Sequence, residues 1–116
     1  MNEIKELFAA YIKFPEESGE VEFEYSVMEI NKVYPDMIET KHFYFTSRNY
    51  STRYFEKSML NKEYEISYEL TVFYSESKED CLKWLTDKRN LLLQIYKNEY
   101  ERLKNSEIKE NIYEFD

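Results

Sequence analysis

Several residue types that carry chemistry or covalent constraints are nearly missing from this chain of 116 residues. It has one glycine, one cysteine, one histidine and two prolines. A glycine-rich phosphate-binding loop cannot be built with one glycine, and one histidine with one cysteine gives a metal site no support. The lone Cys81 also excludes an internal disulfide and suits a reducing compartment. We therefore expect no cofactor and no bound metal.

Long apolar runs are missing too, since the uninterrupted apolar stretches extend over only a few residues. A helix that spans a membrane needs about 20 apolar residues in a row. The first residues also lack the basic and then apolar pattern of a secretion leader. We therefore expect a protein that is cytoplasmic when made and that does not contact a membrane.

The composition does support a folded domain. Hydrophobic residues make up 42% of the chain and aromatic residues 18%, which is too apolar for a disordered protein. The length suits one domain, which we place at residues 1–105, followed by an acidic tail at residues 106–116. The net charge of −8 disfavours direct, specific nucleic-acid binding, because phosphate contacts require lysine and arginine.

Apolar periodicity predicts the outer elements. A recurrence at helical spacing predicts a short amphipathic helix over residues 2–13, which Pro15 ends; it involves Ile4, Leu7, Phe8, Tyr11 and Ile12. Ser77, followed three residues later by Asp80, has the form of a capping box. It opens a long helical pattern over residues 77–104.

Strand patterns lie between these two helices. Apolar and polar residues alternate over 21–27 and again over 63–74, which predicts two strands with one buried face each. Residues 42–46 are apolar on both faces and predict a central strand. The fold class is therefore α+β: a mostly antiparallel sheet of three to five strands, with a short N-terminal helix and a long C-terminal helix packed on one face.

The segment 47–62 differs from its surroundings in charge. Residues 1–46 carry a net charge of −6, residues 47–62 carry +3, and residues 63–116 carry −5. Tyrosine, phenylalanine and arginine are typical of protein interfaces, so we expect this segment to be a protruding hairpin or loop that contacts a protein partner. The candidate contact residues are Arg48, Tyr50, Arg53, Tyr54 and Phe55.

Glutamates occupy the polar positions of two predicted strands. If those strands are neighbours, they form one acidic face, made by Glu22, Glu24, Glu63, Glu65 and Glu69. Such a face has three interpretations: a solvated outer surface, an imitation of a phosphate backbone that occupies a nucleic-acid-binding protein, or the wall of a channel through which DNA slides.

Catalysis has little support. His42 lies in an aromatic strand without a visible acid, serine or cysteine partner, and general-base chemistry needs a positioned partner. Cys81 lies in the first turn of the long helix, where a thiol pKa can be lowered, but it also begins the buried stripe of that helix. We expect His42 to be a structural or surface histidine, Cys81 to be a packed core thiol, and the protein not to be an enzyme.

The order of elements resembles that of the tail terminator and tail completion proteins of bacteriophages. The stretch from Lys62 to Asp80 is similar to their final strand and helix start, and Tyr34-Pro35-Asp36 is similar to the turn before their second strand. The resemblance covers residues 1–96. It implies a small α+β domain that assembles as a ring at the end of the tail tube, with itself and neighbouring tail or connector proteins as partners.

The first prediction is therefore a non-enzymatic phage structural protein of the head–tail connector or tail terminator type, found in the virion and working by ring assembly. The alternative is a small acidic inhibitor, such as an anti-CRISPR or an immunity protein, that blocks a basic groove on a nucleic-acid-binding target. A third possibility is a protein that binds a small molecule in an aromatic pocket.

Overall fold

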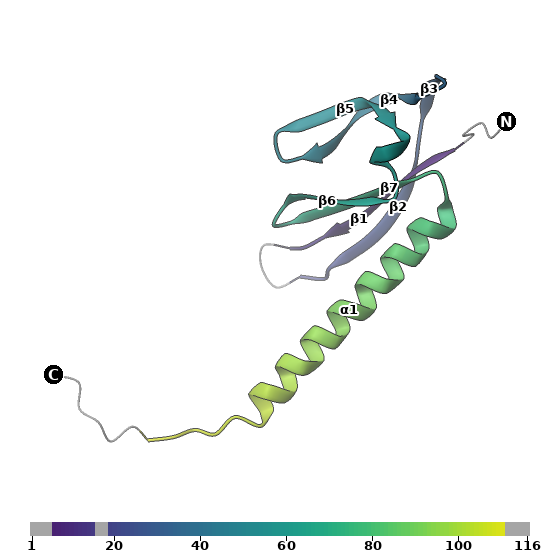
Figure 1. The fold of residues 1–116 in the computed structure, drawn as a ribbon. Coiled ribbons are helices and arrows are strands. Elements are labelled where there is room, and N and C mark those ends of the chain that lie inside the picture. Colours follow the sequence, from purple (N-terminus) through teal and green to yellow (C-terminus); the bar gives the residue numbers. More distant parts are fainter. Residues whose placement is uncertain (1–5, 16–18, 111–116) are drawn as a thin grey trace.

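The structure, a computed structural model, describes residues 6–15 and 19–110. Two antiparallel sheets and one long helix form three layers (Figure 1), so the α+β class is confirmed, but the single predicted sheet of three to five strands is two sheets of four and three strands. Sheet A has the strand order β2-β1-β7-β6 and sheet B the order β3-β4-β5. The elements are β1 (Leu7–Lys13), β2 (Glu22–Met28), β3 (Ile30–Val33), β4 (Met37–Ser47), β5 (Tyr50–Glu56), the 3₁₀ helix η1 (Lys57–Met59), β6 (Lys62–Ser67), β7 (Leu70–Ser75) and α1 (Lys78–Lys104).

The segment predicted as a short N-terminal helix is instead an inner strand of sheet A, so that prediction is wrong for residues 7–13; residues 2–5 lie outside the described part. β1 pairs with β2 on one side and with β7 on the other. Both of its faces are covered. Leu7 and Ala9 pack toward sheet B, whereas Phe8 and Ile12 pack toward α1. A strand buried on both faces is apolar at nearly every position, and this run also satisfied the helical spacing.

The predicted strand over residues 63–74 is a hairpin of two strands, β6 and β7. The chain reverses at Tyr68 and Glu69, and the backbone N–H of Glu69 donates to Ser67 Oγ at 3.2 Å. This turn has neither glycine nor proline. The alternation continues across it, which is why the two strands looked like one.

Other strand predictions are confirmed. The strand predicted at 21–27 is β2, and the chain then passes from sheet A to sheet B between Met28 and Ile30. The predicted turn at Tyr34-Pro35-Asp36 joins β3 to β4, closed by a backbone hydrogen bond from Tyr34 N to Met37 O at 2.8 Å. β4 contains the predicted aromatic strand and is the central strand of sheet B.

The main core lies between the two sheets. Phe55 of β5 and Tyr74 of β7 are fully buried at its centre, with ring centroids 5.1 Å apart. The Tyr74 hydroxyl donates a hydrogen bond to the backbone carbonyl of Phe45, which ties sheet A to sheet B. The buried members of this core are Leu7, Ala9, Met28, Ile38, Phe55, Leu60, Ile66, Val72 and Tyr74.

The helix α1 covers the opposite face of sheet A, as predicted, and its bounds match the predicted 77–104 to within one residue. Ser77 caps it by accepting a hydrogen bond from the Asp80 backbone N–H at 3.2 Å. Trp84 stacks on Phe73 of β7, with ring centroids 5.2 Å apart. Cys81 and Leu85 complete this second core against Phe8, Ala10 and Ile12.

Only the first part of α1 lies on the sheet. The rest extends beyond both sheets (Figure 1), and the described part of the molecule measures 72 × 31 × 23 Å. Residues 105–110 continue outward without regular structure; the remainder of the predicted acidic tail lies outside the described residues. In the described part of the chain, no helix has the length and apolar character that crossing a membrane requires.

Candidate functional site

Exposed aromatic side chains gather on sheet B, on the face that points away from the core. We call this the aromatic–arginine surface; its residues are Phe43, Phe45, Arg48, Tyr50, Arg53 and Tyr54. The aromatic members are between 44% and 66% exposed. A group of large half-exposed rings on an uncovered sheet face is the kind of apolar patch that marks an interaction site.

A large bulge in β4 presents these rings. Glu39 pairs with Tyr54 and Tyr44 pairs with Thr52, so four residues of β4, 40–43, face the single Arg53 of β5. Bulges bend a strand and redirect its side chains. Tyr44 turns inward and its ring packs against Phe55, so by alternation its neighbours Phe43 and Phe45 face outward.

Two buried threonines satisfy the backbone at the bulge. Thr40 Oγ1 lies 2.7 Å from the carbonyl oxygen of His42 and 3.2 Å from that of Arg53. Thr52 Oγ1 accepts from the Tyr54 backbone N–H at 2.9 Å. Because unpaired buried backbone groups are costly, these contacts make the distortion a fixed part of the fold.

The centre of the surface is Arg53. Its guanidinium carbon lies 5.2 Å from the ring centroid of Phe43 and 5.9 Å from that of Tyr54, which are cation–π distances. Its Nε is buried without an acceptor, and no ion pair or hydrogen bond occupies its terminal nitrogens among the described residues. The planar cation is therefore held in place by rings and keeps donors for a ligand.

Glu39 holds the neighbouring tyrosine. Its carboxylate accepts hydrogen bonds from Asn31 Nδ2 of β3 and from the Tyr54 hydroxyl. These two bonds, followed by the nearby charges of Arg53 and Lys32, hold the pKa of Glu39 below its usual value. A carboxylate that stays ionised keeps the Tyr54 ring in the position where it flanks Arg53.

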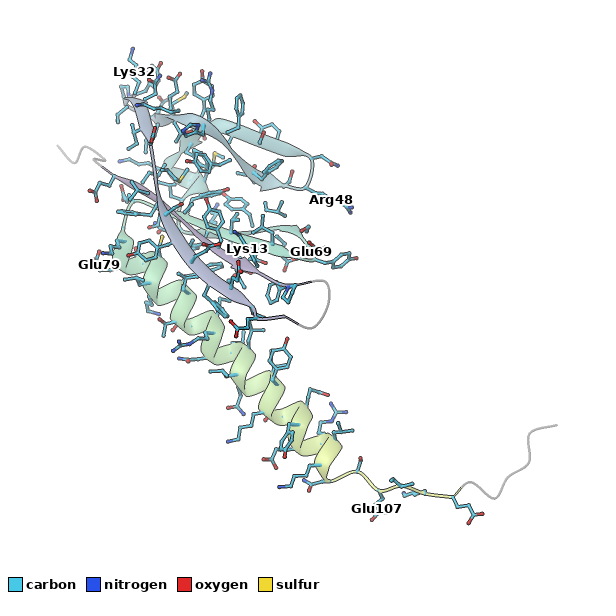
Figure 2. All side chains as sticks on the ribbon, turned by 180° about the vertical axis from the view of Figure 1, so that it is seen from behind. Lys13, Lys32, Arg48, Glu69, Glu79 and Glu107 are labelled. Carbon is cyan, nitrogen blue, oxygen red and sulfur yellow. The ribbon has the colours of Figure 1, made fainter. Side chains whose placement is uncertain are left out.

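Four of the five predicted contact residues are exposed or half-buried in the β4–β5 hairpin, where Arg53 and Tyr54 contact each other, and the fifth is buried. Arg48 and Tyr50 lie at the end of the β4–β5 hairpin, where Figure 2 labels Arg48. Phe55 is fully buried in the core and cannot reach a partner. The segment 47–62 as a whole does not protrude, since β5 pairs along β4 and Leu60 is buried. Sequence reasoning missed Phe43 and Phe45.

The predicted acidic face is not continuous. Glu22 and Glu24 lie on β2 and Glu63 and Glu65 on β6, which are the two opposite edges of sheet A. The register also separates them by face: Glu24 pairs with Tyr11, which packs toward sheet B, whereas Glu63 pairs with Phe73, which packs toward α1. Glu69 lies in the β6–β7 turn.

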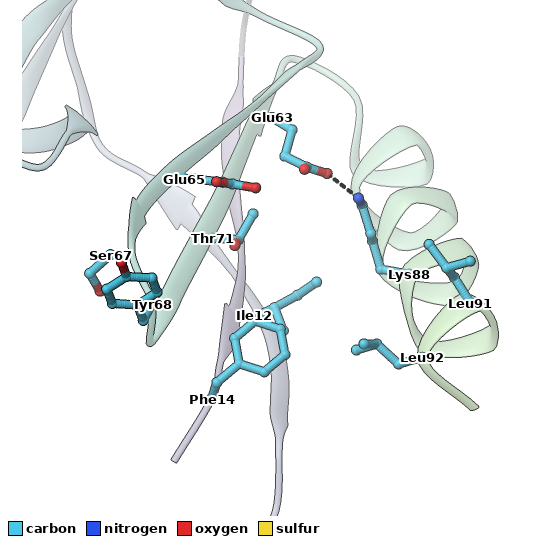
Figure 3. A pocket seen from close by; sticks show the side chains of 10 residues that line it. All are labelled: Ile12, Phe14, Glu63, Glu65, Ser67, Tyr68, Thr71, Lys88, Leu91 and Leu92. Atoms are coloured by element: carbon cyan, nitrogen blue, oxygen red, sulfur yellow. Dashed lines mark ion pairs between the residues drawn. The ribbon is translucent and has the colours of Figure 1, made fainter. Parts of the chain in front are cut away.

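Two of these glutamates line a cleft of about 290 Å³ between sheet A and α1 (Figure 3). Glu63 is already engaged, because it pairs with Lys88 Nζ at 2.5 Å and accepts from Trp84 Nε1 at 3.0 Å. Its contacts hold α1 against the sheet. The lining is Ile12, Phe14, Glu63, Glu65, Ser67, Tyr68, Thr71, Lys88, Leu91 and Leu92.

His42 and Cys81 lie far apart in the fold. His42 is exposed on β4, with Nε2 3.6 Å from a Glu29 carboxylate oxygen. Cys81 is fully buried against sheet A, as expected from the helix stripe. Among the described residues, no three histidine, cysteine, aspartate or glutamate side chains gather where they could hold a metal ion.

Burial raises the pKa of the Cys81 thiol from 9.0 to about 11, and the nearby Asp80 charge adds to the shift. Below pH 9 both the folded and the unfolded chain keep the thiol proton. Between pH 9 and 11 only the unfolded chain loses it, so we expect stability to fall by about 2 kcal/mol over this range. Urea unfolding of the wild type and of Cys81→Ala, compared across these pH values, measures the difference.

The same burial predicts that Ellman's reagent will label the native thiol at least 100-fold more slowly than the urea-unfolded thiol at pH 8. Fast native labelling would mean that the first turn of α1 is not packed on sheet A.

The fold is thus an antiparallel two-sheet α+β domain in which one face of sheet B is not covered by any described element. Comparisons with protein-family models, with curated proteins and with solved structures found no match to this chain.

Proposed function

We propose that this chain is a non-catalytic protein-binding domain, and that a partner docks on the aromatic–arginine surface of sheet B. The observation that supports this most is the Arg53 guanidinium, held between the exposed rings of Phe43 and Tyr54. Arginine and tyrosine dominate the energetics of protein interfaces. Stacking also removes much of the entropic cost of fixing a long side chain when a partner binds.

The surface suggests the chemistry of the partner. The rings supply apolar area, and the terminal nitrogens of Arg53 supply donors suited to a carboxylate. We therefore expect an apolar partner surface with at least one acidic side chain opposite Arg53. The more specific proposal, a phage connector or tail terminator, requires that this surface meet a different surface of a neighbouring copy, because only head-to-tail contacts close into larger rings.

The inhibitor alternative depended on regularly spaced carboxylates. Since those carboxylates occupy opposite edges and faces of sheet A, they do not form the array that would imitate a phosphate backbone.

Replacing Phe43 and Tyr54 with alanine is expected to weaken partner binding at least tenfold, because it removes both rings that hold Arg53. The control is Tyr68→Ala, which removes one exposed aromatic ring at the β6–β7 turn on the other sheet. Affinity capture from host lysate with the three baits would identify a partner, and titration calorimetry with that purified partner would give the ratio of affinities. Thermal midpoints should remain similar.

Equal capture by the wild type and the double variant would contradict the proposal. A labelled single-stranded oligothymidine serves as a separate probe, since rings with arginine can also stack on bases. If that oligonucleotide binds the wild type and Tyr68→Ala but not the double variant, the partner of this surface is a nucleic acid and not a protein.

A further inference from the structure

The last part of α1, residues 93–104, has no tertiary partner among the described residues. Every residue from 93 to 104 is exposed, although the helix continues to Lys104. At about 1.5 Å per residue, this segment projects roughly 18 Å beyond its last contact with the sheet. Figure 2 shows it leaving the two sheets as a single bare helix. We call residues 91–104 the helix overhang.

The helix overhang is strongly amphipathic. Its large apolar side chains beyond Leu92 are between 46% and 76% exposed; they are Leu93, Ile95, Tyr96, Tyr100 and Leu103. With Leu92, they fall on one side at helical spacing. The opposite side is polar throughout and carries Gln94, Lys97, Asn98, Glu101 and Lys104. Such a stripe is typical of a helix that packs against another element.

The stripe continues one that is already used. Leu85 packs against sheet A seven residues before Leu92, and Leu103 follows eleven residues after Leu92 on the same side of the helix. The first half of the stripe is therefore buried within the chain, and the second half is exposed. About three helical turns without tertiary contacts, residues 93–104, are marginally stable in water.

We propose that the helix overhang pairs in antiparallel orientation with the helix overhang of a second copy. A two-fold axis between residues 97 and 98 places Leu92 against Leu103 of the second copy. The same axis places Tyr96 against Glu99 of the second copy. An isologous interface requires this kind of self-complementary pattern.

The charges on the helix overhang agree with this pairing. Glu99 is the acidic residue on the seam, and Arg102 of the same helix already pairs with it at 2.8 Å. The Tyr96 hydroxyl can donate to that carboxylate across the seam. Lys97, Glu101 and Lys104 face away from the second copy. The two Glu99 side chains lie on the seam, about 4.5 Å apart along the helices, and each is paired with Arg102 of its own helix, which offsets their repulsion.

Size and orientation also favour a second copy. Six large apolar side chains from each copy, at roughly 100 Å² each, give about 1,200 Å² of buried surface, the lower bound for a specific interface. Antiparallel pairing places the two sheet bodies at opposite ends. Parallel pairing would bring both bodies to the same end of the pair. The aromatic–arginine surface is not used, so the dimer would present two copies of it.

Multi-angle light scattering of the full chain tests the pairing. We expect the mass to rise with concentration from 14.4 kDa to twice that value. Tyr96→Glu with Leu103→Glu should remain monomeric at every concentration. The control, Gln94→Glu with Asn98→Glu, adds the same charge on the polar side and should behave as the wild type. All four positions are exposed, so circular dichroism should show an intact fold.

Disulfide cross-linking tests the orientation. A mixture of Leu92→Cys and Leu103→Cys chains should form a covalent heterodimer, because these positions are opposite each other. Leu92→Cys alone should not cross-link, since its two copies would lie about 16 Å apart along the helices. Three results would overturn the proposal. The wild type could stay monomeric, the dimer could survive Tyr96→Glu with Leu103→Glu, or Leu92→Cys could preferentially form homodimers. If the Phe43 and Tyr54 double variant lost partner capture but kept the mass of the dimer, the result would bear on the aromatic–arginine surface of sheet B and not on the pairing of the helix overhangs.

Discussion

Replacing Phe55 with alanine is expected to lower the free energy of unfolding by about 3–5 kcal/mol, as for other fully buried aromatic residues. The ring has no exposed surface and contacts Tyr44 and Tyr74 in the core between the sheets. Removing it leaves a cavity that strands held in two hydrogen-bonded sheets cannot easily close. The total free energy of unfolding of a domain of this size is about 5–15 kcal/mol, so this variant would lose much of its stability.

The control is Phe43→Ala, an identical chemical change on the next strand. Its ring is 66% exposed, so we expect a change below about 1 kcal/mol. Urea unfolding followed by circular dichroism gives both values. If the two variants lost equal stability, the assignment of Phe55 to the core and of Phe43 to the exposed binding surface of sheet B would be wrong.

This pair of phenylalanines shows where sequence reasoning stops. Arg53, Tyr54 and Phe55 have the composition of an interface, and on that basis all three were expected to contact a partner. In a strand, however, neighbours point to opposite faces, so Phe55 enters the core while Tyr54 remains outside. Phe43 and Phe45 belong to the same surface, but nothing in the sequence indicates which face of an aromatic strand is covered.

Elements with a local signal were predicted well. Ser77 and Asp80 supply the cap of α1 within four residues, and the stripe from Cys81 through Leu85 follows one helical period. β2 alternates clearly in sequence, and it is an edge strand of sheet A. These signals depend on a few neighbouring residues, so they are readable without knowledge of the rest of the fold.

Elements that depend on packing against distant parts of the chain were not predicted well. β1 reads Leu-Phe-Ala-Ala-Tyr-Ile, and it is a strand because sheet B and α1 cover its two faces. Ala9 and Ala10 favour a helix in isolation, and tertiary burial overrides that preference. The positions of β2 and β6 at the two edges of sheet A also depend on pairing between distant segments, which the sequence does not show. Their glutamates were expected on one face, and only the strand order separates them.

Tyr74 offers the second large effect, because it links both sheets. Its ring centroid lies 5.1 Å from that of Phe55 and 5.9 Å from that of Tyr64. Its hydroxyl donates a hydrogen bond to the Phe45 carbonyl of β4. We expect Tyr74→Ala to cost about 3–5 kcal/mol of stability. Tyr74→Phe keeps the ring, and it should cost about 1–3 kcal/mol because the Phe45 carbonyl loses its donor.

The pH dependence separates the hydroxyl from the ring. Burial raises the pKa of Tyr74 above its ordinary value of 10.0. Below pH 10 the folded and unfolded chains both keep the phenol proton, so stability does not depend on it. Above pH 10 only the unfolded chain ionises this group, so its contribution falls as the pH rises. Urea unfolding between pH 8 and 11 should therefore show a smaller alkaline loss for Tyr74→Phe than for the wild type.

The exposed Tyr50 provides the matched control, since Tyr50→Phe removes the same hydroxyl from the end of the β4–β5 hairpin. Its alkaline loss should equal that of the wild type, because this change leaves the Tyr74 hydroxyl and the core between the sheets intact. Cys81 is unchanged in both variants, so the part of the loss that begins at pH 9 should remain. An alkaline loss in Tyr74→Phe as large as that of Tyr50→Phe would mean that the Tyr74 hydroxyl is not sealed between the sheets. The backbone of β4 would then lack the anchor that holds Phe43 and Phe45 outward.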